Sequence, residues 1–220
     1  MKNIKIAPSI LGVPCLEAPN VITKLINDGA ELIHYDVMDG KFVSNTSFPI
    51  EEYEYHKQKV DSSIVFDVHL MTYDLFENVK KYSQGATYLT FHYEAIEENR
   101  INELIDYMHS LNVNAGISIC PDTDVSVLEP YLNKVQLVLV MSVVPGKGGQ
   151  SFMPVALDKI SYLDEYRKQN NLSYLIEVDG GINDETSKLV KERNVDILVA
   201  GSFIIKSSDY KTQIEKLKQW

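Results

Sequence analysis

Three short segments place acidic and imidazole side chains at alternating positions: residues 34–36 (His-Tyr-Asp), 67–69 (Asp-Val-His) and 177–179 (Glu-Val-Asp). Because side chains alternate between the two faces of a β-strand, His34 and Asp36 share one face, as do Asp67 and His69. Two imidazoles and two carboxylates at one place form a nitrogen and oxygen ligand set suited to Zn²⁺, Fe²⁺, Mn²⁺ or Co²⁺. A single interior histidine is more often a hydrogen-bonded core residue, but several such residues in matching positions favour a metal site.

A glycine-rich stretch at residues 144–151, which includes Lys147, is a second candidate for ligand binding. Glycine exposes its backbone N–H and tolerates positive φ, which suits anion binding. Further glycines occur at 180–181 and 201, the latter followed by Ser202. Each loop alone is compatible with a simple tight turn, whereas three loops in one sector favour a bound phosphate.

Short β-branched apolar runs alternate with longer amphipathic stretches along the chain. The runs are residues 4–10, 32–37, 64–70, 88–92, 114–119, 137–143, 174–178 and 196–200, and helical spacing appears at 97–111, 155–168 and 211–219. Eight strands that are each followed by a helix predict an α/β fold, a (β/α)8 TIM barrel, with residues 1–220 forming a single domain. A doubly wound open sheet has the same alternation. In a barrel, the polar residues above would meet where the strands end.

The composition excludes several classes of protein. A net charge of −10 without a strong basic patch argues against a nucleic-acid partner. No apolar run approaches the roughly 20 residues that span a bilayer, and the N-terminus reaches Pro8 before any signal-peptide core develops. Two cysteines without CxxC spacing are typical of a reduced, cytoplasmic protein.

These segments resemble the ribulose-phosphate 3-epimerase family along the whole chain, in order. The matching blocks are residues 7–11, 34–40 with 42–43 and 45, 67–71, 91–95, 140–143 with 145–146 and 148–152, 176–182 and 199–202. The resemblance implies a (β/α)8 barrel of the ribulose-phosphate-binding type, and a reaction that inverts carbon 3 to interconvert D-ribulose 5-phosphate and D-xylulose 5-phosphate. Family members often self-associate, so a homo-oligomer is a further expectation.

The resemblance also implies roles for particular residues. His34, Asp36, His69 and Asp179 would hold one divalent metal ion, Zn, Fe, Mn or Co, and Asp36 and Asp179 would also be the acid/base pair. Ser9 and His69 would contact the substrate near the metal. The phosphate would lie against the loops that carry Gly146, Gly148, Gly149, Gly180, Gly181, Gly201 and Ser202. Asp67 is a candidate hydrogen-bond acceptor for a ligand imidazole.

Epimerisation beside a ketone removes a carbon-bound proton and returns one to the opposite face, which one base on each side can do through an enediolate. The chain departs from the family pattern at Lys41, Ser44, residues 120–123 and Lys147, which leaves substrate preference open. A 3-epimerase of a hexulose 6-phosphate such as allulose 6-phosphate is one alternative, and a non-catalytic sugar-phosphate binder is a more remote one. A lyase that uses an Asp-x-Lys-x-x-Asp strand motif is disfavoured, since Asp36 stands where that motif has lysine.

Overall fold

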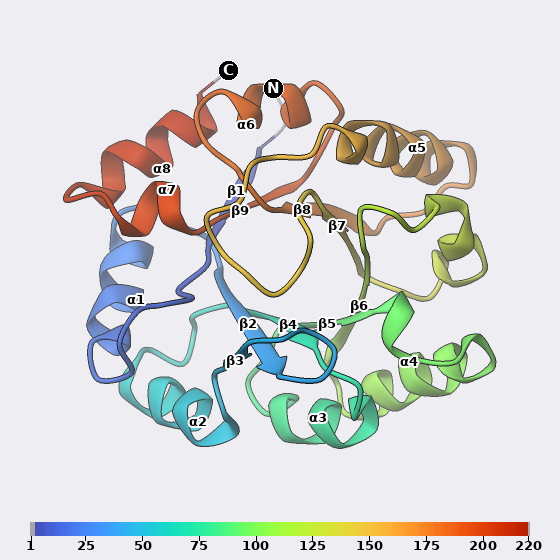
Figure 1. The fold of residues 1–220 in the computed structure, drawn as a ribbon, viewed down its shortest axis with the longest axis horizontal. Coiled ribbons are helices and arrows are strands. Elements are labelled where there is room, and N and C mark those ends of the chain that lie inside the picture. Colours follow the sequence, from blue (N-terminus) through green and yellow to red (C-terminus); the bar gives the residue numbers. More distant parts are fainter. Residues whose placement is uncertain (1–2, 220) are drawn as a thin grey trace.

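The computed structural model describes residues 3–219, and its strands form one closed sheet (Figure 1). The parallel strands are β1 (Lys5–Pro8), β2 (Ile33–Asp39), β4 (Phe66–Met71), β5 (Tyr88–His92), β6 (Asn114–Ile119), β7 (Leu137–Met141), β8 (Leu175–Asp179) and β9 (Ile197–Ala200). The sheet order is β1-β9-β8-β7-β6-β5-β4-β2-β3. A parallel bridge between Ser9 and His34 joins β1 to β2, so the order closes into a barrel.

Helices surround this barrel on the outside (Figure 1). They are α1 (Ala18–Asn27), α2 (Ile50–Lys59), α3 (Leu75–Tyr82), α4 (Ile101–Ser110), α5 (Val155–Gln169), α6 (Thr186–Lys191), α7 (Ser202–Ile205) and α8 (Tyr210–Lys218). The largest apolar cluster lies between the helices and the outward-facing strand residues, such as Tyr35 and Val37 of β2. Because these residues face outward, their neighbours His34 and Asp36 point into the barrel.

The fold confirms the predicted barrel and places each predicted strand within two or three residues of its expected bounds. The helix predicted over 97–111 is confirmed: it begins with the 3-10 turn η2 (Glu98–Arg100) and continues as α4. The helix expected after β6 is the 3-10 helix η3 (Val125–Tyr131) and not an α-helix. Pro130 lies inside this segment, and proline lacks the N–H that an α-helix interior needs.

A short antiparallel strand, β3 (Thr46–Ser47), pairs with the end of β2 and was not predicted. At two residues it is too short to show a periodic pattern in the sequence. In residues 3–219, every helix falls short of the length and apolar character that crossing a membrane requires.

The barrel interior has two unlike parts. Apolar side chains of β1, β7 and β9 pack together there, among them Ala7, Leu137, Leu139, Ile197 and Val199. From β2, β4, β5 and β6, buried polar side chains point inward instead: His34, Asp36, Asp67, His69, Thr90, His92 and Ser118. The candidate site is built on this polar part.

Candidate active site

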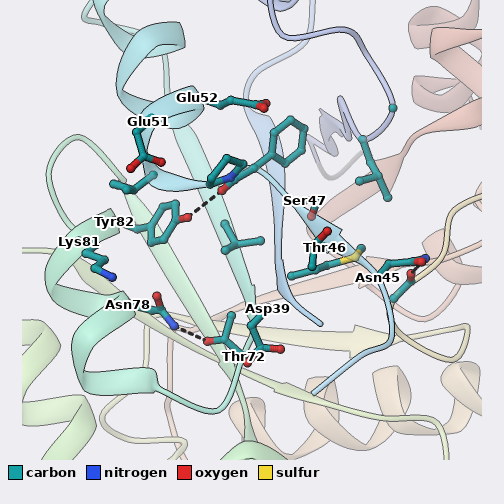
Figure 2. A pocket seen from close by; sticks show the side chains of 18 of the residues that line it. Asp39, Asn45, Thr46, Ser47, Glu51, Glu52, Thr72, Asn78, Lys81 and Tyr82 are labelled. Atoms are coloured by element: carbon teal, nitrogen blue, oxygen red, sulfur yellow. Dashed lines mark hydrogen bonds between the residues drawn. The ribbon is translucent and has the colours of Figure 1, made fainter. Parts of the chain in front are cut away.

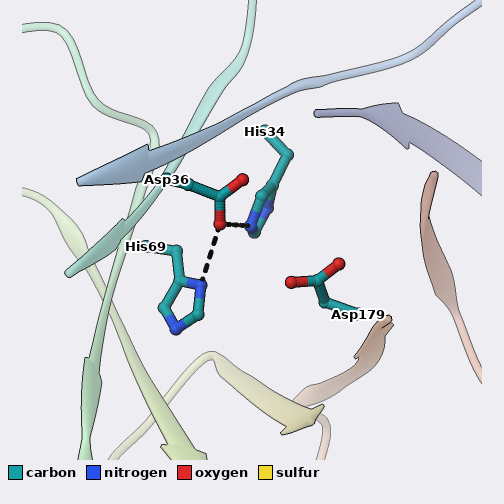
Figure 3. Close-up of side chains that lie close together, drawn as sticks. All are labelled: His34, Asp36, His69 and Asp179. Atoms are coloured by element: carbon teal, nitrogen blue, oxygen red, sulfur yellow. Dashed lines mark hydrogen bonds and ion pairs between the residues drawn. The ribbon is translucent and has the colours of Figure 1, made fainter. Parts of the chain in front are cut away.

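Side chains from three strands meet at the carboxyl end of the barrel (Figure 3). His34 and Asp36 come from β2, His69 comes from β4 and Asp179 ends β8. One possible ligand atom from each of the four lies within 4.8 Å of the others. The register explains part of this convergence, because β2 and β4 pair in parallel with Asp36 opposite His69. The four residues expected to meet therefore do so.

Three neighbours surround the carboxylate of Asp36. Its Oδ1 lies 3.3 Å from His34 Nε2 and 3.3 Å from His69 Nδ1 (Figure 3). Its Oδ2 accepts a 2.6 Å hydrogen bond from the hydroxyl of Ser9. Burial alone would raise the pKa of Asp36, but the adjacent charge of His34 and the contacts with both imidazoles hold it well below its usual range. Asp36 is thus a carboxylate at neutral pH.

His34 is fully buried between two carboxylates. Its Nδ1 donates a 2.5 Å hydrogen bond to Asp67 Oδ2, as expected for an acceptor that orients a ligand imidazole. Burial would lower the pKa of His34, but Asp36 and Asp67 together raise it well above its usual value. Its Nε2 faces the site and has no hydrogen-bond partner among residues 3–219.

These observations fit a divalent cation. Nε2 of His34 has no hydrogen-bond partner among residues 3–219 and lies beside three other potential ligand atoms, so a cation could take the place of the proton on this nitrogen. Two ligands at the usual zinc–nitrogen distance of about 2.0–2.1 Å in a tetrahedral set lie roughly 3.4 Å apart. The two Asp36–imidazole separations of 3.3 Å match that spacing.

Asp179 lies across the site from Asp36 and differs from it (Figure 3). It is half-buried, and within the described chain its carboxylate makes no hydrogen bond. Burial, together with the negative charge of Asp36, raises the pKa of Asp179 to about 7. The two carboxylates of the site therefore have opposite protonation tendencies near neutral pH.

A cavity of about 930 Å³ opens above this group. Asp36 and Asp179 line it, together with every residue expected at a substrate or phosphate site except His69: Ser9, Gly146, Gly148, Gly149, Gly180, Gly181, Gly201 and Ser202. His69 is fully buried and does not line the cavity. Met38, Met71 and Met141 line the walls as adaptable apolar surface.

Glycine is required where the loops of the rim approach one another. A Cβ on Gly181 would come within 2.4 Å of the backbone nitrogen of Phe152, and one on Gly146 within 2.7 Å of Val43. Both glycines also have positive φ, 64° and 103°. The segment after β7 can therefore lie over the barrel centre, where Figure 1 shows it in gold.

A second cavity of about 880 Å³ adjoins the first, and Leu11, Met38 and Gly146 line both (Figure 2). Its wall is formed by α2, α3 and the short strand β3. Tyr82 donates a hydrogen bond to the carbonyl of Phe48 there. None of the four clustered residues lines this second cavity.

Sequence reasoning missed two functional features. Glu177 lies under the site, fully buried, with Oε1 3.9 Å from His34 Nδ1 and with the pKa raised, chiefly by burial and by Asp67. Its position two residues before Asp179 was the available signal. His92 and Glu94 belong to a matching segment of the resemblance, but no role was predicted for them.

The fold and the site define a (β/α)8-barrel protein whose nitrogen and oxygen ligand group lies at the carboxyl ends of the strands. Residues 5–205 match the Ribulose-phosphate 3 epimerase family. The chain is 37% identical over 220 residues to "Ribulose-phosphate 3-epimerase" of Bacillus subtilis (strain 168), covering 98% of each chain. It is 35% identical to the protein of that name from Chlamydia muridarum (strain MoPn / Nigg), covering 93% of this chain and 90% of the relative. The chain belongs to the ribulose-phosphate 3-epimerase family.

Solved structures support the fold alone. KGPDC from Streptococcus mutans superposes with a TM-score of 0.74 at 13% identity, covering 99% of this chain and 96% of that one. A 3-hexulose-6-phosphate synthase gives a TM-score of 0.71 at 13% identity, with 98% of both chains covered.

Proposed function

We propose that this protein is a metal-dependent 3-epimerase that interconverts D-ribulose 5-phosphate and D-xylulose 5-phosphate. The observation that carries the proposal is the convergence of Asp36 and Asp179 with two imidazoles beneath a glycine-rimmed cavity. Family membership supplies the substrate, because the relatives that match over nearly the whole chain are named ribulose-phosphate 3-epimerases.

The two carboxylates act from separate strands. Asp36 comes from β2 and Asp179 from β8, and β1 and β9 lie between them around the barrel. A substrate between them presents one face of carbon 3 to each aspartate. The charged Asp36 removes the proton from its face, and Asp179 returns a proton to the other face. The reverse reaction exchanges these roles.

His34, Asp36, His69 and Asp179 would hold the divalent cation, Zn, Fe, Mn or Co. When bound, it supplies positive charge that stabilises the oxygens of the deprotonated substrate. Asp67 orients His34 through the 2.5 Å hydrogen bond to Nδ1, which leaves Nε2 directed at the site. Ser9 orients Asp36 by donating to its Oδ2.

The sugar phosphate would lie in the 930 Å³ cavity. Its phosphate would contact the loops at Gly146, Gly148 and Gly149, at Gly180 and Gly181, and at Gly201 and Ser202. Lys147 and Lys206 also line this cavity and add positive charge. The methionines pack against the sugar carbons on the walls.

The decisive experiment combines metal analysis with an assay on ribulose 5-phosphate. The purified protein should contain about one equivalent of divalent metal, form xylulose 5-phosphate, lose activity on chelation and recover it with Zn²⁺, Mn²⁺, Fe²⁺ or Co²⁺. Higher kcat/KM on allulose 6-phosphate would instead identify a hexulose phosphate epimerase. Ligand binding without turnover by the metal-loaded protein would identify a binder and overturn the proposal.

The proposal extends to the setting of the enzyme. Its two cysteines are free thiols, which agrees with the reducing cytoplasm proposed for it. A single domain over residues 1–220 and self-association into a homo-oligomer belong to the same proposal, as does the absence of a nucleic-acid partner.

A further inference from the structure

A second buried imidazole lies directly behind His69. His92 ends β5, and its Nε2 is 2.8 Å from Nε2 of His69. The two ring centroids are 4.9 Å apart, and Phe42 covers the other side of the His92 ring at 4.7 Å. Since His69 and His92 are both fully buried, one nitrogen of this close pair must carry the hydrogen and the other must accept it.

The far nitrogen of His92 meets a carboxylate. Glu94 places Oε2 3.2 Å from His92 Nδ1. A carboxylate accepts hydrogen bonds, so His92 Nδ1 carries the hydrogen and donates it. Cys120 Sγ, 3.7 Å from the same nitrogen, is the other neighbour there.

The position of Glu94 is itself fixed. Its Oε1 accepts from the backbone N–H of Cys120 at 2.8 Å and from the hydroxyl of Thr123. The loop that supplies these donors is held by Lys159 of α5. The buried Lys159 ammonium donates to the carbonyl oxygens of Cys120, Pro121 and Thr123 at 2.8, 2.7 and 2.6 Å.

These contacts show how His69 can present a lone pair to a metal. With hydrogen on Nδ1 alone, the ring of His92 has a lone pair on Nε2. The facing Nε2 of His69 must then be the donor, so the Nδ1 of His69 keeps its lone pair. That lone pair is directed at the site, where Nδ1 and Asp36 Oδ1, 3.3 Å apart, would both face a bound cation. Without a cation, the Asp36 carboxylate favours hydrogen on Nδ1 instead, so the support from His92 and Glu94 matters for the metal-bound state. A metal ligand needs such a lone pair.

We propose that Glu94, acting through His92, is a positioning residue that sets the tautomer of His69 for metal binding. The inference rests on the proposed function only in taking His69 as a ligand. The outer support of the site therefore runs from Lys159 through the loop at 120–123 to Glu94, His92 and His69. It is separate from the contact by which Asp67 orients His34.

Glu94→Gln should move the hydrogen to the other ring nitrogen in both His92 and His69. The amide oxygen must occupy the Oε1 position, because the N–H of Cys120 needs an acceptor there. The amide NH₂ then faces His92 Nδ1 and donates to it. His92 must carry its hydrogen on Nε2, which donates to His69, and His69 must carry its hydrogen on Nδ1. The lone pair that faces the site is lost.

The test measures the His69 tautomer and the metal affinity separately. In Zn²⁺-loaded wild-type protein with ¹⁵N-labelled histidine, two-bond nitrogen–hydrogen correlation spectra should show hydrogen on Nε2 of His69 and on Nδ1 of His92. Competition with a chelator should show Zn²⁺ bound about 10–100-fold more weakly by Glu94→Gln. The matched control is Glu97→Gln, the same change at an exposed position, which should leave both quantities unchanged.

Hydrogen on Nε2 of His92 in the Zn²⁺-loaded wild type, or the same Zn²⁺ affinity in the wild type and in Glu94→Gln, would overturn the inference. If Glu94→Gln does not fold, His92→Leu provides the second test, because it removes the acceptor for His69 Nε2 and should weaken Zn²⁺ binding similarly. Unchanged affinity in folded His92→Leu would also overturn it. Turnover of ribulose 5-phosphate by the wild type tests the proposed function on its own, since neither tautomer nor Zn²⁺ affinity depends on substrate.

Discussion

On the β2–β4 side of the barrel mouth, Asp36 is held by the hydroxyl of Ser9 and by two imidazoles, and its pKa lies well below the usual range. On the β8 side, the half-buried carboxylate of Asp179 makes no hydrogen bond within residues 3–219, and its pKa is raised to about 7. Both groups are aspartates at strand ends, yet one is held charged and the other can keep a proton. Environment, not residue type, separates the base from the acid.

The contrast extends into the barrel. Behind Asp36, the inward positions of β4, β5 and β6 are polar, and they supply His69, His92 and the loop that holds Glu94. The apolar part of the interior is provided by β1, β7 and β9. One side of the barrel can therefore fix the orientation of the imidazoles through hydrogen bonds, while on the other side apolar packing fixes the positions of the strands.

Removing the carboxyl group of Asp36 or of Asp179 should have the largest effect on activity. Asp36→Asn and Asp179→Asn should each lower kcat on ribulose 5-phosphate by about 10³-fold or more, because each removes one proton-transfer group. Circular dichroism should show that both variants fold. Carbon-3 exchange with deuterated water at the wild-type rate in either variant would refute the two-base role of that aspartate.

The next largest effect should come from removing the residue that orients His34. Asp67→Asn removes the carboxylate that accepts from His34 Nδ1, so Zn²⁺ affinity should fall about 10–100-fold in a chelator competition. Asp106→Asn, an exposed position on α4, is the matched control and should bind as tightly as the wild type. Equal Zn²⁺ affinities in the two variants would show that Asp67 does not support metal binding.

The two aspartates should affect the stability of the metal-free protein in opposite directions. Asp179 has a raised pKa, so its contribution to the free energy of unfolding is complete below about pH 4 and is lost as the pH rises to about 7. Asp36 has a lowered pKa, so its contribution is present at neutral pH and is lost on acidification.

Urea unfolding at about pH 8 should therefore find Asp179→Asn more stable than the wild type and Asp36→Asn less stable, each by about 1–3 kcal/mol. The gain in Asp179→Asn should disappear at about pH 4. Changes of the same sign in both variants at the higher pH would contradict the proposed difference between the two sides.

The smallest effect is expected at Ser9. Ser9→Ala removes the 2.6 Å hydrogen bond to Asp36 Oδ2 but leaves both imidazole contacts in place. Because the two imidazoles still hold Asp36, only part of the about 1.5–3 kcal/mol that a hydrogen bond to a charged group contributes should be lost, and kcat should fall about tenfold. A loss as large as that of Asp36→Asn would mean that Ser9 acts on the substrate directly and not through Asp36.

The strands and the four clustered residues could be predicted from the sequence because both depend on short-range patterns. Apolar runs mark strands buried on two faces, and the alternation within residues 34–36 and 67–69 fixes which side chains share a face. The partner of Asp67 could not be predicted in the same way. It is His34 on the neighbouring strand, which only the β2–β4 register reveals.

The contacts that orient His69 could not be predicted from the sequence for the same reason. His92 is 23 residues from His69 along the chain, and Lys159 is 39 residues from Cys120. Such pairs arise from the packing of separate elements, and nothing in the local sequence marks them. The 3-10 helix η3 is a local feature, and Pro130 was the signal that the helical expectation overlooked.

The most direct test of the central claim is anomalous X-ray diffraction from crystals of the Zn²⁺-loaded protein. The account predicts one strong anomalous peak within about 2.0–2.3 Å of His34 Nε2, His69 Nδ1 and a carboxylate oxygen of both Asp36 and Asp179. A peak elsewhere, for example at the neighbouring group of His92, Glu94 and Cys120, or one that lacks His34 or His69 as a ligand, would contradict it.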